Sequence, residues 1–341
     1  MWTEDRLNSL LTTPSNALVA DMRRLSGDLL VLGAGGKMGP SLCVLAKRAF
    51  EMAGKTARVI AVSRFSGREE QRYLEENGVE TIKADLLDPA RRAALPRVEN
   101  AVFMAGRKFG TRGQEWLTWA MNASLPAFIA EQFRESRVVA FSSGNVYPPV
   151  APPGCTEETQ PAPLGEYAMS CLARERAFEY AAQRYGTPVL LYRLNYATDL
   201  RYGVMHDIAK SILEGRPVPL RTPRFNIIWQ GSANEIALRG LLQTASPALK
   251  LNVTGPEILS VRETAIRLGE ILGKAPVFEG RESEIAEGAH ALLSDASKAL
   301  ALFGPPAVLA DTLVEWQGQW LLEGGRGLDK PTHFEERKGS Y

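Results

Sequence analysis

Cysteine and histidine are both scarce in this chain of 341 residues, which contains three of each. So few cysteines exclude the disulfide framework of a small secreted domain and are typical of a reducing compartment, so we expect a cytoplasmic location. No cysteines and histidines are grouped at the spacing of metal ligands. We therefore expect no metal site.

A surplus of one charge is also lacking, because 40 basic residues balance 39 acidic ones. Nucleic acid and charged membrane surfaces are therefore poor candidate partners. No apolar run approaches the roughly 20 residues of a membrane span, and the first residues, M-W-T-E-D-R, lack the apolar core of a signal peptide. Hydrophobic residues make up 45% of the chain, enough for a large core and a second lobe. We expect the partner to be a small-molecule substrate.

The most informative stretch is residues 28–39, D-L-L-V-L-G-A-G-G-K-M-G. Its apolar start, residues 29–32, predicts a parallel strand that is buried on both faces. Apolar and small residues from about 37 to 50 predict a helix. Between strand and helix the glycines form a G-x-x-G-x-x-G pattern, which in this context is typical of dinucleotide binding. The alternative is a glycine-rich turn without a ligand.

Each glycine of the pattern has its own expected role. Gly33 allows a tight turn, Gly36 lets backbone N–H groups approach a pyrophosphate, and Gly39 lets the helix pack close to the strand. The start of the helix, with Lys37 and Met38, then directs its partial positive charge at the phosphates.

The end of the second predicted strand, residues 58–63, bears on the choice of cofactor. Dinucleotide-binding folds often place an acidic residue there to hold the ribose hydroxyls. This chain has Ser63 and Arg64 instead. An arginine suits a 2′-phosphate better, so we expect NADP, with NAD as the alternative. The alternative is that Arg64 is an ordinary exposed residue of a loop and contacts no cofactor.

The third and fourth predicted strands, residues 79–84 and 100–105, end near the same cofactor. Asp85, followed by Leu86, is placed either to reach the adenine amino group or to cap its own turn. Small residues after the fourth strand let the backbone lie near the cofactor; these are Ala105 and Gly106. Arg107 and Lys108 then begin a polar loop that faces either a substrate phosphate or solvent.

A long helix is expected over residues 114–133, with Asn122 in its middle. A mid-helix asparagine is usually exposed or a satisfied polar group of the core. The fifth strand, residues 137–141, is followed by S-S-G-N-V-Y, and Tyr167 opens the next helix.

Together with the glycine pattern, the S-S-x-x-V-Y motif and Tyr167 resemble the extended short-chain dehydrogenase/reductase family, the NAD-dependent epimerase/dehydratase proteins. The R-L-N-Y of residues 193–196 resembles the R-x-x-N that follows a strand in this family. Further segments that match are residues 251–255, 260–263, 294–298 and 313–320, so that the resemblance covers about residues 28–322.

The resemblance implies an α/β fold: a Rossmann-type doubly wound parallel sheet with a smaller C-terminal substrate lobe, here preceded by an N-terminal helical extension. The extension, residues 1–27, is expected to contain two helices, the second beginning at Thr13-Pro14, and to pack on the core or on a partner subunit. The Rossmann domain is expected at 28–196, completed by a return to the sheet at about 225–245. The substrate lobe then comprises 197–224 and 246–341, whose tail from 324 we leave unassigned.

For the active site, the resemblance implies that Ser143 polarises a carbonyl and that Tyr167 transfers the proton. The family has a lysine four residues after this tyrosine, which binds the nicotinamide ribose and lowers the tyrosine pKa. Here Cys171 stands in its place. Arg174, one turn further on nearly the same helix face, is the candidate replacement charge. The remaining cofactor contacts are expected at Asn122, Tyr167, Cys171 and Asn195.

The function implied is hydride transfer between NADP, or alternatively NAD, and a sugar or nucleotide-sugar. Epimerisation, dehydration and reduction share this step. Arginines suit a diphosphate, and the lobe offers Arg201, Arg216, Arg221 and Arg224. A homodimer is also implied, because many relatives pair the helices that correspond to residues 114–133 and 167–185. The alternative function is a catalytically weak dinucleotide-binding sensor or assembly protein, which the missing lysine favours.

Overall fold

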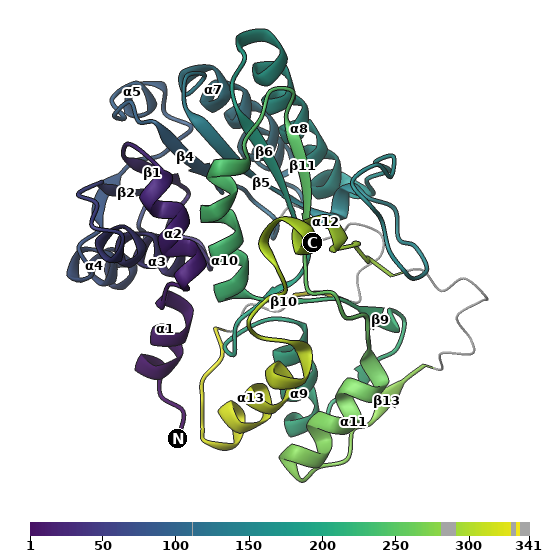
Figure 1. Cartoon of the computed structure of the whole chain (residues 1–341). Coiled ribbons are helices and arrows are strands. Elements are labelled where there is room, and N and C mark those ends of the chain that lie inside the picture. The colour runs from purple at the N-terminus through teal and green to yellow at the C-terminus, as the bar shows by residue number, and fades with distance from the viewer. Residues whose placement is uncertain (111, 281–290, 329–331, 335–341) are drawn as a thin grey trace.

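The computed structural model describes residues 1–110, 112–280, 291–328 and 332–334 (Figure 1). A seven-stranded sheet lies at the centre, in the order β11-β6-β5-β4-β1-β2-β3, and every neighbouring pair is parallel. This arrangement confirms the Rossmann-type α/β fold. The strands are β1 (Leu29–Leu32), β2 (Val59–Ser63), β3 (Glu80–Lys83), β4 (Asn100–Phe103), β5 (Arg137–Ser143), β6 (Val189–Leu194) and β11 (Leu249–Val253).

Helices cover both faces of the sheet, and the alternation of strand residues explains why. In β1, Leu29 and Val31 belong to one hydrophobic core, whereas Leu30 and Leu32 belong to the core on the opposite face. The first core is covered by α2 (Asn16–Arg24), α3 (Gly39–Met52), α4 (Arg68–Glu76) and α10 (Gln230–Arg239). The other is covered chiefly by α7 (Leu125–Gln132) and α8 (Gly165–Tyr185), with α5 (Pro89–Ala93) nearby.

A second lobe lies below the sheet in Figure 1 and has a hydrophobic core of its own, which we call the second core. Its helices are α9 (Val204–Glu214), α11 (Val261–Leu272) and α13 (Ala310–Leu322). Three short strand pairs lie outside the central sheet: β7 (Ala197–Thr198) with β10 (Ile228–Trp229), β8 (Val218–Pro219) with β13 (Phe278–Glu279), and β9 (Arg224–Phe225) with β12 (Leu259–Ser260). Three further short elements are η2 (Gly144–Val146), η3 (Gly240–Gln243) and α12 (Ser297–Phe303). Among the described residues, no helix is both long and apolar enough to span a membrane.

The strand that completes the sheet is not where the sequence analysis placed it. Residues 225–229 form two-residue strands outside the central sheet, because Phe225 and Trp229 are buried in the second core. The chain then crosses the sheet face as α10, and β11 pairs with β6 to become the seventh strand. The boundary predicted at residue 246 therefore assigned a sheet strand to the wrong lobe.

The N-terminal extension packs on two hydrophobic cores of its own chain, the second core and the first core of the sheet. Helix α1 (Glu4–Thr12) contributes Leu7 and Leu11 to the second core, and α2 contributes Leu18 to the first. The predicted start of the second helix is wrong, since the side chain of Ser15 accepts the capping hydrogen bond and Pro14 precedes the cap. The helix predicted from residue 37 likewise begins later, at Gly39, because the glycine turn extends to Met38.

The helix predicted over residues 114–133 is interrupted. It consists of α6 (Glu115–Trp119), a π-helical turn η1 (Ala120–Ser124) and α7. Pro126 has no N–H to donate to the carbonyl four residues earlier, that of Asn122, and the N–H of Leu125 bonds instead to Ala120, five residues back. The wider turn is therefore centred on Asn122, one of the predicted site residues.

Candidate active site

Two adjoining cavities, of about 280 and 220 Å³, lie at the carboxyl ends of the parallel strands. They share Gly33 and Gly36, which follow β1, and Met104, which follows β4. The strand order reverses between β1 and β4, and open α/β sheets bind ligands outside such a reversal. We call the smaller one the adenosine cavity, after the part of the cofactor that its residues are predicted to contact. We call the larger one the tyrosine cavity, after Tyr167 in its wall.

At two of its glycines, Gly33 and Gly39, the turn between the two cavities has room only for backbone. Gly33 has φ +93°, and a Cβ there would lie 2.5 Å from the backbone nitrogen of Ala105. A Cβ on Gly39 would lie 2.2 Å from the carbonyl oxygen of Ala34. Gly36 instead faces open space: within the described part of the chain, only Gly33 O, at 3.6 Å, lies near its ideal Cβ. A pyrophosphate fits this cradle, because the space that a side chain would fill at Gly36 is left open.

The adenosine cavity gathers most of the residues predicted for the cofactor's adenosine half. Asp85 lies in its wall, yet its Oδ1 accepts a hydrogen bond from the N–H of Leu87 at 3.0 Å, so it also caps the turn after β3. Phe65, which the sequence analysis missed, adopts φ +41°, a strained conformation for an aromatic residue. The predicted residues in the wall are Gly33, Gly36, Ser63, Arg64, Asp85, Leu86, Ala105 and Gly106.

The tyrosine cavity brings together the end of β5 and the start of α8. Ser143 is the last residue of β5 and lines this cavity together with Tyr167, while its hydroxyl donates to Asn145 Oδ1 at 3.0 Å. Burial raises the pKa of Tyr167 well above its usual value, as desolvation of the phenolate requires. The other predicted residues in the wall are Lys37, Met38 and Asn195.

Four predicted site residues lie outside the walls of both cavities: Gly39, Asn122, Cys171 and Arg174. Asn122 Oδ1 accepts hydrogen bonds from Arg107 N at 2.8 Å and from Arg174 Nη2 at 2.9 Å. Arg174 Nη1 donates to the carbonyl oxygen of Phe141 at 2.7 Å. These two side chains therefore fix the backbone on either side of the cleft rather than line it.

Cys171 occupies the helix position of the family's lysine. Its side chain is fully buried and lies outside the walls of both cavities. Burial raises the pKa of this thiol. Since the thiolate is the nucleophile, we interpret Cys171 as an inert small residue on the buried face of α8.

Lys108 is the most important residue whose place the sequence analysis left open. It lines the tyrosine cavity, and its Nζ lies 5.7 Å from the centre of the Tyr167 ring. Burial, followed by repulsion from Lys37, lowers the pKa of Lys108 to about 8. The loop after the fourth strand signalled a polar residue near the cleft, but not that this side chain turns towards Tyr167.

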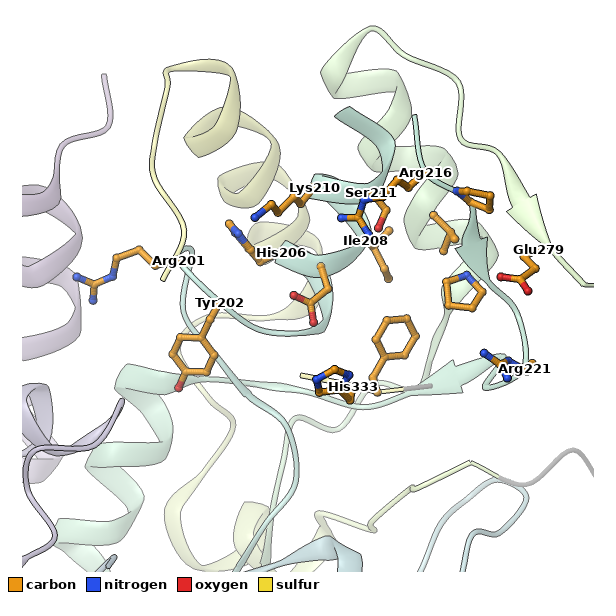
Figure 2. A pocket seen from close by; sticks show the side chains of 15 residues that line it. Arg201, Tyr202, His206, Ile208, Lys210, Ser211, Arg216, Arg221, Glu279 and His333 are labelled. Carbon is orange, nitrogen blue, oxygen red and sulfur yellow. The ribbon is translucent and has the colours of Figure 1, made fainter. Parts of the chain in front are cut away.

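A third and larger cavity, of about 530 Å³, opens in the second lobe (Figure 2). Of the predicted arginines, Arg201, Arg216 and Arg221 line it, whereas Arg224 does not. Figure 2 shows the guanidinium of Arg201 directed away from the cavity, where it pairs with Asp199 at 2.6 Å. Arg216 likewise pairs with Glu214 at 2.5 Å, so Arg221 is the better placed to meet an anionic group.

The C-terminal tail also reaches the cleft, which nothing in the sequence indicated. Thr332 lines the tyrosine cavity and donates from N and Oγ1 to Asp207 Oδ2, at 2.8 and 2.5 Å. His333 lines the lobe cavity and lies 5.9 Å from the ring of Phe109. Phe334 is buried in the second core. Residues 329–331 and 335–341 of the unassigned tail lie outside the described residues.

Comparison with known proteins agrees with this geometry. The model of the NAD dependent epimerase/dehydratase family matches residues 29–221. A mutant of the UDP-glucuronic acid 4-epimerase from Bacillus cereus is 19% identical with a TM-score of 0.71, over 87% of this chain and 99% of that one. The Bordetella bronchiseptica enzyme WbmG is 18% identical with a TM-score of 0.72, over 90% and 98%. No curated protein matches by sequence.

Proposed function

Because this chain belongs to the NAD dependent epimerase/dehydratase family, we propose that it binds a nicotinamide dinucleotide along the two adjoining cavities and catalyses hydride transfer on a nucleotide-sugar. The observation that carries this proposal is that Ser143 and Tyr167 lie together in the wall of the cavity that continues from the glycine turn. Such a pair is suited to a carbon that changes between alcohol and ketone.

The roles of the chain's own groups follow from their positions. Backbone N–H groups around Gly36 and the N-terminus of α3 hold the phosphates, and the residues of the adenosine cavity hold the adenosine. The bound nicotinamide supplies the acceptor or donor of the hydride. Ser143 donates a hydrogen bond to the reacting oxygen of the sugar. Tyr167 takes the hydroxyl proton as an alcohol becomes a ketone and returns it in the reverse direction.

The cofactor we propose is NADP, with NAD as the alternative. Arg64 in the wall of the adenosine cavity supports NADP, because a guanidinium matches a 2′-phosphate. The similar structures support NAD, since the Bacillus cereus epimerase and WbmG are both described in complex with NAD. Measured affinities of this chain for the two dinucleotides decide between them.

The substrate class follows from the lobe cavity. The similar Bacillus cereus epimerase was solved with UDP-glucuronic acid, and the Thermotoga maritima UDP-glucose 4-epimerase with UDP-glucose. Arg221 in the lobe cavity gives this chain a cation for a diphosphate, with Arg216, which pairs with Glu214, beside it in the same wall. We therefore place the diphosphate in the lobe cavity and the sugar next to Tyr167.

We also propose a homodimer through the outer surface of α7 and α8. Phe178 faces the chain's own sheet and is fully buried, but Phe128 is 48% exposed and Tyr180 is 61% exposed. Met169 and Tyr185 add further exposed apolar surface on α8. A second copy would cover this surface by a two-fold interface. Light scattering at micromolar concentration would give twice the chain mass.

The central experiment is direct. The purified protein is heated, and released nucleotides are identified by mass spectrometry. NAD and NADP affinities are measured by calorimetry, and turnover is followed by NMR with a panel of nucleotide-sugars bearing uridine, thymidine, guanosine and cytidine diphosphates. We expect micromolar dinucleotide binding and conversion of at least one sugar. Failure to bind either dinucleotide would overturn the proposal, and binding without any turnover would favour the sensor alternative.

A further inference from the structure

We propose that Tyr202, just before α9 of the second lobe, positions the end of the glycine turn, Lys37 and Met38, for the pyrophosphate of the dinucleotide. Its hydroxyl acts through buried polar side chains of α3 and α10 that line none of the three cavities described above, so Tyr202 is a positioning residue. The effect on binding rests on the dinucleotide function proposed above, whereas the hydrogen bonds are a property of the protein alone.

The first argument is a buried network of hydrogen bonds between Tyr202 and the turn. The Tyr202 hydroxyl donates to Gln230 Oε1 at 2.6 Å, and Gln230 Nε2 donates to Ser41 Oγ at 2.9 Å. Asn234 Nδ2, one turn further along α10, donates to the same oxygen at 2.9 Å. All four side chains are buried. A hydroxyl has two lone pairs and one hydrogen. Since the two amides use the lone pairs, the hydrogen of Ser41 is donated to Met38 O, at 3.0 Å.

The carbonyl of Met38 sets the direction of a backbone N–H group at the start of α3. It belongs to the same planar peptide unit as the N–H of Gly39, and in a trans peptide the two groups point in opposite directions. Gly39 is the first residue of α3, where N–H groups have no partner within the helix and are suited to a phosphate. Holding the carbonyl towards Ser41 therefore fixes the orientation of an N–H that a pyrophosphate would meet.

A second contact joins Tyr202 to the same turn. Lys37 Nζ lies 4.4 Å from the centre of the Tyr202 ring, within the range of a cation–π interaction. Tyr202 lines the tyrosine cavity together with Lys37 and Met38, and it also lines the lobe cavity (Figure 2). One side chain thus holds two successive residues of the turn, one by its ring and the other through its hydroxyl. Burial raises the pKa of Tyr202 well above its ordinary value, so the hydroxyl keeps the proton that it donates.

Tyr192 offers a matched control, because it is another buried tyrosine whose hydroxyl bonds to α10. Its hydroxyl donates to the carbonyl oxygen of Ala233 at 2.6 Å, and not to an amide side chain of the network. Tyr192→Phe and Tyr202→Phe each remove one buried hydroxyl and one hydrogen bond to the same helix. We therefore expect similar losses of stability in denaturant unfolding. Only Tyr202→Phe breaks the network that leads to the turn.

The test that needs no ligand is amide hydrogen exchange, followed by mass spectrometry on peptides that cover residues 33–42. We expect faster exchange in Tyr202→Phe and in Gln230→Leu than in the wild type, because the turn opens more often when its network is broken. Exchange in Tyr192→Phe should match the wild type. Unchanged exchange in Tyr202→Phe, or an equal increase in Tyr192→Phe, would overturn the inference.

Calorimetry with NAD and NADP then measures the effect on binding. We expect Tyr202→Phe and Gln230→Leu each to weaken binding of the preferred dinucleotide about 3–10-fold, the value of one hydrogen bond. The double variant should lose no more than the weaker-binding single variant, because both substitutions break the same network. Tyr192→Phe should bind as the wild type does. Wild-type affinity in Tyr202→Phe, or fully additive losses in the double variant, would contradict the network.

The two proposals fail in different ways. A wild-type protein that binds neither dinucleotide overturns the proposed function, and hydrogen exchange still decides whether Tyr202 positions the turn. A wild-type protein that binds a dinucleotide, with exchange and affinity unchanged in Tyr202→Phe, keeps the proposed function and overturns only the role of Tyr202.

Discussion

The two ends of the cleft differ in how far apart along the chain their residues lie. The adenosine cavity is lined by residues 33–121, most of which follow the carboxyl ends of four strands of one sheet. The lobe cavity combines α9 and β8 with Glu279 and with His333 of the tail. A parallel sheet brings successive strand ends together automatically. Residues of the lobe meet only because of packing between distant segments, so their positions leave no local pattern.

Tyr167 lies where the two ends meet, and its removal should have the largest effect. We expect Tyr167→Phe to lower kcat roughly 10²–10⁴-fold, the range of a positioned acid or base, while dinucleotide affinity stays near wild type. Stopped-flow kinetics and calorimetry on the same preparation measure both. Ser143→Ala should lower kcat less, because one hydrogen-bond donor to the reacting oxygen is lost. Full activity of Tyr167→Phe would make the tyrosine a structural residue of α8.

At the cofactor end, Gly36→Glu should weaken dinucleotide binding by about 100-fold or more, since a negative side chain would occupy the space of a pyrophosphate. The fold should survive, because the ideal Cβ of Gly36 makes an ordinary contact with Gly33 O, at 3.6 Å. Gly36→Ala is the matched control and should have a much smaller effect. Calorimetry with NAD and NADP measures the effect. Equal affinities in the wild type and in Gly36→Glu would contradict a pyrophosphate site at Gly36.

At the substrate end, Arg221→Glu should raise KM for the nucleotide-sugar about 10-fold or more with little change in kcat, as expected when a charge-assisted contact to the substrate is lost. Arg224→Glu offers a close control, because Arg224 is exposed and lies outside the lobe cavity. Equal effects of the two substitutions would show that general charge, and not the lobe cavity, attracts the substrate.

The smallest effect is expected from Arg64→Asp. Arg64 lines the mouth of the adenosine cavity on an exposed loop, where solvent weakens its charge. The substitution should move the ratio of NADP to NAD affinity by about 10-fold towards NAD, because the new carboxylate repels a 2′-phosphate. If the wild-type protein already prefers NAD, Arg64 does not select a 2′-phosphate and is an ordinary surface residue.

The sequence predicted what local patterns control. Leu29–Leu32 and the three glycines carry a strand, a turn and a helix within about twenty residues, and the structure has all three. It did not predict that β11 completes the sheet, because that depends on whether residues 225–229 pack on the sheet or in the second core. Nor did it predict the π-helical turn, although Pro126 was a visible signal for it.

The candidate site divides in the same way. Ser143 lies at the end of a strand and Tyr167 near the start of a helix, so the sequence motif could predict where both residues lie. The approach of Lys108 to Tyr167 and of Thr332 to the tyrosine cavity depends on side-chain directions in segments far apart in the chain. Hydrophobic periodicity contains no information about such approaches, and only the folded chain shows them.

The N-terminal extension has a consequence for motion. Helix α1 is anchored in the core of the second lobe through Leu7 and Leu11, and α2 in the first core through Leu18 and Met22, with only residues 13–15 between them (Figure 1). Separating the lobes on this side would pull a helix out of its core, at about 1.5–3 kcal/mol for each large apolar side chain exposed. The extension therefore resists separation of the two lobes on the side where it packs.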